Sequence, residues 1–146
     1  MALNPRIANV IAILGLDALL DGLDAGGGAA TIDGRSGAQP TDPDTVTSGT
    51  RLFANVMTDP AFAGATDGTG KATAAASAIS DDTSADATGT LGYCRIGSTT
   101  TPPTLIDDLI DGEASTSGAD YNFNTVAIVS GATVSFTALT IDLSET

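Results

Sequence analysis

The chain has 146 residues, which fits one domain long enough to bury an ordinary core. Its 18 acidic and 5 basic residues give a formal net charge of -13, which disfavours nucleic acids and anionic membranes as partners because both are bound through Lys and Arg. The chain has no histidine and one cysteine, which excludes His-based catalytic triads, imidazole metal ligands and an intramolecular disulfide.

The composition favours sheet over helix. Ala, Gly and Thr dominate the chain, aromatic residues make up only 4% and Trp is absent. Thr and Val suit a pleated surface because branching at Cβ restricts χ1 and packs well between neighbouring strands. We therefore predict a mainly β protein whose core is built from small and β-branched side chains.

The first 25 residues differ from the rest and predict a helix. Asn4 and Pro5 form a typical start, with Asn as N-cap and Pro at the first helical position. Two neighbouring apolar stripes follow at helical spacing, the first with Ile7, Val10, Ile11, Leu14 and Ala18 and the second with Ile13, Leu16, Leu20 and Leu23. A helix with so much apolar surface needs cover on more than one side, from its own sandwich or from another subunit. We take residues 1–28 as a helical arm ending in a glycine-rich hinge.

Two targeting interpretations compete with this helix. Arg6 followed by an apolar run resembles a secretory signal, but Asp17 and Asp21 interrupt the run and no clean cleavage site precedes the glycines. A membrane span is disfavoured because the uninterrupted apolar stretch falls well short of about 20 residues.

From Ala29 onward the chain predicts short strands separated by Gly, Pro, Asp and Ser clusters. The expected strands are Thr31–Arg35, Thr50–Met57, Ala72–Ile79, Thr90–Ile96, Leu109–Thr116, Tyr121–Val129 and Thr133–Leu143. The expected long loops are Ser36–Ser48, Thr58–Gly70 and Ser98–Pro103. Seven strands predict a single antiparallel β-sandwich over residues 29–146.

The last expected strand changes phase partway along. Its apolar residues are first Val134, Phe136 and Ala138, and then Leu139, Ile141 and Leu143 on the opposite parity. A bulge would absorb this slip, or the strand passes from covering one surface to covering another. A subunit contact at the second set is a further alternative.

Acidic clusters are the main candidates for chemistry. Asp81, Asp82 and Asp86 lie close enough together to suggest calcium, but their spacing does not fit an EF-hand loop, and a solvated turn is favoured. A carboxylate pair for acid and base catalysis is conceivable among Asp107, Asp108 and Asp111. An acidic strand edge or a short amphipathic turn explains these residues better.

Two further motifs favour structural roles. The run 64–70, GATDGTG, lacks the Lys-Ser/Thr ending of a phosphate-binding loop and is expected to be a flexible loop. Cys94 lies in an apolar run, where a buried thiol acting as a small hydrophobe is expected. We therefore expect no enzymatic activity, no metal and no cofactor.

Three runs in the second half of the chain resemble a family of small structural proteins of tailed phages. They are TSADATGTLGYCRI at 83–96, IDGEASTSGADYNF at 110–123 and IVSGATVSF at 128–136, and a weaker match is the Leu-Asp-Ala element at 16–18 and 23–25. The resemblance implies a virion component, a head decoration or cement protein of jelly-roll type, and brings no catalytic residues with it. The longer segments Gly37–Ser48 and Thr99–Asp108 depart from the family pattern, which puts loop contacts in doubt.

The expected function is therefore a structural virion protein on the exterior of the capsid head. Its expected partners are the major capsid protein and further copies of itself, as a homotrimer or homodimer, with no nucleic acid and no membrane. The expected contact residues are Ile7, Val10, Ile11, Leu14, Leu139, Ile141 and Leu143. The helix could instead cap the core of the sandwich.

Three alternatives belong to other classes of protein. A tail or neck component would use the same fold in a ring. A secreted adhesin or carbohydrate-binding module would need signal cleavage, and a glycan-degrading enzyme would need paired carboxylates that include Asp107 or Asp111.

Overall fold

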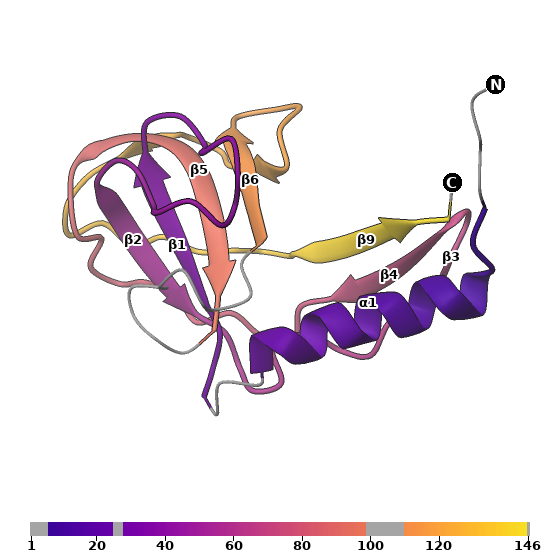
Figure 1. Ribbon diagram of the computed structural model, residues 1–146. Coiled ribbons are helices and arrows are strands. Elements are labelled where there is room, and N and C mark those ends of the chain that lie inside the picture. The colour runs from indigo at the N-terminus through magenta and orange to yellow at the C-terminus, as the bar shows by residue number, and fades with distance from the viewer. Residues whose placement is uncertain (1–5, 25–27, 99–109, 146) are drawn as a thin grey trace, which may run out of the picture.

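The computed structural model describes residues 6–24, 28–98 and 110–145. The described chain is mainly β, with one helix and two sheets (Figure 1). Helix α1 spans Asn9–Asp24, and the strands are β1 Thr31–Ser36, β2 Arg51–Val56, β3 Thr66–Gly68, β4 Lys71–Ala75, β5 Gly89–Gly97, β6 Ile110–Ser115, β7 Tyr121–Asn122, β8 Ala127–Ile128 and β9 Thr140–Ser144.

The two sheets define two parts of the molecule. The larger sheet has the strand order β2-β1-β5-β6-β7, with β8 paired to β5, and we call this sheet and its loops the head. The smaller sheet has the order β3-β4-β9, and together with α1 it forms what we call the arm. Figure 1 shows the arm projecting from the head, with α1 lying along one face of the small sheet.

A single two-sheet sandwich is not confirmed. The main contacts of each strand are within its own sheet, and the small sheet packs on α1 instead of on the head sheet. Helix α1 lies outside the head, as an arm would, but the strands that it covers come from the segment 29–146. In the described part of the chain no helix is long and apolar enough to cross a membrane.

Four expected strands are found close to their predicted bounds, namely β1, β2, β5 and β6. The short strand β3 was missed, because it lies inside the expected loop Thr58–Gly70. It pairs with β4 through a tight turn in which Gly70 has a φ of 71°, a conformation that glycine adopts at low cost. The expected strand Tyr121–Val129 was too long, since only β7 and β8 at its two ends are paired.

The phase slip in the last expected strand marks the passage from the head to the arm. Val134 pairs with Asp82 in an isolated bridge, and the Phe136 ring packs 6.3 Å from the ring of Phe53 in the head. The strand β9 begins only at Thr140 and pairs with β4 in the arm. The apolar residues before and after the slip therefore cover two different surfaces, which is one of the three explanations offered by the sequence.

Helix α1 begins later than expected. The predicted start at Asn4 and Pro5 lies outside the described residues, and residues 6–8 are not helical. The backbone N–H of Ile7 donates instead to the carbonyl of Glu145 at 3.2 Å. This hydrogen bond ties the chain before the helix to the end of β9, so helical structure starts only beyond it.

Candidate interaction surface

One side of α1 holds the arm together. Its buried residues are Ala12, Leu16, Leu20 and Leu23. Opposite them, Ala72 and Ala74 of β4 are buried, and in the register of the sheet they pair with Leu143 and Ile141 of β9. Small side chains on β4 let the helix approach the sheet closely, and an added Cβ at Gly15 would lie 3.4 Å from Leu143.

The opposite side of α1 is also apolar, and it is exposed. Ile7 is 40% exposed, Val10 60%, Ile11 54% and Leu14 59%, and Ala18 continues the stripe one helical turn further on. Ile7 precedes the helix, so we call the four helical residues of this stripe, Val10, Ile11, Leu14 and Ala18, the outer face of α1. Isolated exposed apolar side chains are common on proteins, but a contiguous stripe is a feature of interaction sites.

The charged residues of the helix fall into two groups. The carboxylates of Asp17 and Asp24 accept hydrogen bonds from the backbone N–H groups of Ala65 and Ala61, at 2.6 and 2.9 Å, and so fix the segment that leads into β3. Asp21 near the end of the helix is exposed and has no such bond among the described residues. Arg6, just before the helix, is also exposed.

The seven contact residues predicted from the sequence do not form one surface. Val10, Ile11 and Leu14 lie together on the outer face, as helical spacing requires, whereas Ile7 is exposed but lies before the first helical residue. Leu139, Ile141 and Leu143 are half-buried and pack against the core, the last two beneath α1. Sequence reasoning missed Leu19, which is 46% exposed beside the outer face and lies at an (i, i+8) position from Ile11.

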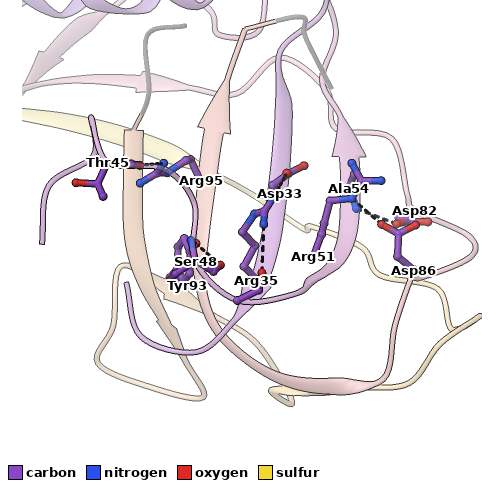
Figure 2. Close-up of polar contacts among 11 residues, drawn as sticks. Asp33, Arg35, Thr45, Ser48, Arg51, Ala54, Asp82, Asp86, Tyr93 and Arg95 are labelled. Carbon is purple, nitrogen blue, oxygen red and sulfur yellow. Dashed lines mark hydrogen bonds and ion pairs between the residues drawn. The ribbon is translucent and has the colours of Figure 1, made fainter. Parts of the chain in front are cut away.

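The head contains a second cluster of charged groups, and it holds the loop between β1 and β2 on the sheet. The Arg95 guanidinium donates to the Thr45 carbonyl at 2.9 Å and pairs with the Asp111 carboxylate at 2.7 Å. The side-chain amide of Gln39 donates to the other Asp111 oxygen at 2.8 Å. The Tyr93 hydroxyl donates to the Ser48 carbonyl at 2.8 Å and accepts from its N–H (Figure 2).

A neighbouring ion pair in the head is deeply buried. On β1, the guanidinium nitrogen Nη2 of Arg35 lies 3.4 Å from the carboxylate oxygen Oδ2 of Asp33, and the Asp33 side chain has no exposed surface. Burial raises the pKa of Asp33, although the nearby positive charge of Arg35 acts in the opposite direction. The Asp33 carboxylate therefore carries its charge at a cost to folding, and this group is part of the core of the head.

The acidic clusters suggested by the sequence serve local structure. The Asp82 carboxylate accepts from the backbone N–H groups of Ala54 and Ser84, both at 2.9 Å, and Asp86 pairs with Arg51 at 2.7 Å (Figure 2). In residues 6–24, 28–98 and 110–145 no three acidic, Cys or His side chains are placed to hold a metal ion. Asp111 is bound to Arg95, while Asp107 and Asp108 lie outside the described residues.

Two further candidates are a thiol and an open depression. Cys94 is fully buried in the head, and burial raises the pKa of its thiol, so the reactive thiolate is disfavoured. A depression of about 270 Å³ lies between the head and β9, bordered by Asp111, Tyr121 and Ile141 among others. Its volume is below the about 300–1,000 Å³ typical of small-molecule sites.

No protein-family model, curated protein or solved structure significantly matches this chain. The resemblance to phage structural proteins therefore stays a prediction from the sequence.

Proposed function

We propose that the protein is a structural component of a tailed-phage virion that decorates or cements the outside of the capsid head. The observation that carries this proposal is the apolar outer face of α1. A contiguous apolar stripe is costly to expose to water, so a surface of this kind is expected to be covered in the working assembly.

The charges of the chain support a role in binding. In the head, the arginines and several carboxylates hold loops and the core, as the pairs Arg95–Asp111 and Arg51–Asp86 illustrate. The net charge of -13 favours a basic surface as the larger partner, because complementary potentials steer and orient encounter. We propose the major capsid protein as that partner and assign the chain no catalytic role.

The jelly-roll-like sandwich implied by the resemblance belongs to the same proposal. The head sheet would form one layer, and the irregular chain that carries Phe123 and Phe136 would form the other. These two rings lie 5.3 Å apart and both pack on Phe53 of β2, which supports a second layer at this place.

The proposal is tested by the copy number of the chain in purified particles, measured by quantitative mass spectrometry against the major capsid protein. A ratio near one copy per capsid subunit, or a simple fraction of it, with density outside the shell in cryo-electron microscopy, is expected. A handful of copies per particle would indicate a tail or neck component, and absence from particles would reject a virion role.

A pair of variants connects this test to the outer face. Leu14→Lys places a charge in the middle of the stripe, while Val129→Lys changes a residue of the head that is equally exposed, both being 59% exposed. We expect Leu14→Lys to lower the copy number and Val129→Lys to leave it unchanged.

A further inference from the structure

We infer that the outer face of α1 is covered by the same face of a second copy of this chain, with the two helices antiparallel about a two-fold axis near Leu14. This inference rests on one part of the proposed function, namely that the outer face is an assembly surface. It does not need a capsid, so it can be tested with the purified chain.

The distribution of charge at the two ends of the stripe supports an antiparallel pair. Arg6 precedes the stripe at its N-terminal end, and Asp21 follows it at its C-terminal end. The other four basic residues, Arg35, Arg51, Lys71 and Arg95, form ion pairs within the chain. Within the described residues, Arg6 is thus the basic side chain without an ion pair, and Asp21 has no polar partner either.

An antiparallel arrangement brings these two unpaired charges together. Leu14 lies midway between Ile7 and Asp21 in sequence, so a two-fold axis there brings Arg6, one residue before Ile7, to the end of the other helix that carries Asp21. Parallel helices would instead set Arg6 against Arg6 and Asp21 against Asp21. Because like charges in contact are unfavourable, the charges favour the antiparallel arrangement.

The sizes of the side chains agree with the same axis. An axis at Leu14 sets the larger Val10 of one helix level with the small Ala18 of the other. Large side chains opposite small ones allow two helices to interdigitate, and Leu14 meets its own copy at the centre. Both surfaces are identical and self-complementary, which is the property that a two-fold interface requires.

Repulsion between two acidic chains sets a limit on this association. At about 0.15 M salt the screening length is about 8 Å, so only charges close to the interface oppose the pairing strongly. A contact made by one helix face is at the small end of protein interfaces, and a dissociation constant in the micromolar range is expected. A lattice that holds many copies would make such a weak contact effective.

Cysteine cross-linking tests the contact directly. The native Cys94 is buried and unreactive, so Leu14→Cys introduces the reactive thiol of the chain, and Val129→Cys serves as an exposed control in the head. Under mild oxidation we expect a covalent dimer of Leu14→Cys and mainly monomer of Val129→Cys. Equal cross-linking of the two variants, or none at position 14, would overturn the inference.

Charge exchange tests the direction of the helices in the full chain. Arg6→Glu and Asp21→Arg should each weaken self-association about tenfold in sedimentation equilibrium, because each puts like charges together at two symmetry-related places. The double variant should return to near the affinity of the unchanged chain. A double variant as weak as either single one contradicts the antiparallel arrangement.

The failure of this inference is distinguishable from that of the proposed function. A chain that stays monomeric at about 0.5 mM, well above the expected micromolar range, refutes the pair of helices. If this monomer is still found in particles at high copy number, another partner covers the outer face and the virion role stands. Circular dichroism of every variant confirms that the fold is retained, as expected for exposed positions.

Discussion

The head and the arm are held together by different interactions. In the head, buried charged side chains such as Arg95 and Asp111 hold a long loop on the sheet, at a distance of 2.7 Å between the paired atoms. In the arm, leucines of α1 such as Leu16 pack on alanines of β4. The comparison teaches that charged side chains that could take part in chemistry support the fold in the head, whereas the arm exposes an apolar face of α1.

The largest expected effect concerns the buried charges of the head. Arg95→Leu leaves the Asp111 carboxylate, whose side chain is only 5% exposed, without its cation. Breaking a buried pair in this way typically costs about 3–5 kcal/mol, and urea denaturation should show a loss in that range. The matched control is Arg51→Leu, because its pair with Asp86 is much more exposed and should be worth less than about 1 kcal/mol. Equal losses for the two variants would contradict the importance of burial.

The next effect separates the two faces of α1. Leu16→Ala removes a fully buried side chain from the arm and should lower the free energy of unfolding by about 2–5 kcal/mol. Leu14→Ala, on the outer face, should change it by less than about 0.5 kcal/mol in dilute protein. Denaturation curves of both variants at the same low concentration make this measurement. A large loss for Leu14→Ala would mean that the outer face is part of the fold of the single chain.

A smaller effect depends on pH and belongs to the head. Burial raises the pKa of Asp33 above its ordinary value of 3.8, so the folded state holds this proton more tightly than the unfolded state. As the pH falls from neutral through the raised pKa towards 3.8, the unchanged chain should gain stability relative to Asp33→Asn. Urea denaturation of both proteins at several pH values measures the difference. A difference that does not vary with pH, or that varies in the opposite direction, contradicts the raised pKa.

The smallest effect is expected on the polar side of the arm. Lys71 and Asp142 pair at 2.6 Å on the open face of the small sheet, and the hydrogen bond from Lys71 lowers the pKa of Asp142. The stabilisation is present above pH 3.8 and is lost as the pH falls through the lowered pKa. Lys71→Met should cost less than about 1 kcal/mol, since both side chains are exposed and screened by solvent. An NMR titration of the Lys71→Met variant should show the pKa of Asp142 raised towards 3.8 relative to the unchanged chain. The same pKa in both proteins would contradict the ion pair.

The sequence predicted local features of the fold better than the pairing of distant segments. The Gly, Pro, Asp and Ser clusters between β1, β2, β5 and β6 were enough to locate these strands. The sequence also separated the two stripes of the helix, but it predicted them as neighbours, whereas the buried Leu16 and the exposed Leu14 lie on opposite sides of α1. The small sheet was not predicted, since β4 and β9 are far apart in the sequence and local patterns do not specify partners.

The cluster in the head shows why the candidate sites were harder to predict. Arg95 lies in an otherwise apolar run, and neither its hydrogen bond to Thr45 nor its pairing with Asp111 has a local signal. Asp82 was noted as part of an acidic cluster, but its hydrogen bond to the backbone of Ala54 depends on the three-dimensional arrangement. Carboxylates that suggest metal binding in the sequence can thus be used to fix loops.

The central claim is that the outer face of α1 is covered in the working assembly, and thiol accessibility tests it most directly. The alkylation rate of Leu14→Cys would be measured in dilute free protein and in purified particles, with Val129→Cys as the exposed control. We predict rapid labelling of both positions in free protein and strong protection of position 14 alone in particles. Equal labelling of position 14 in both samples would show that the outer face stays open to water and would contradict the account.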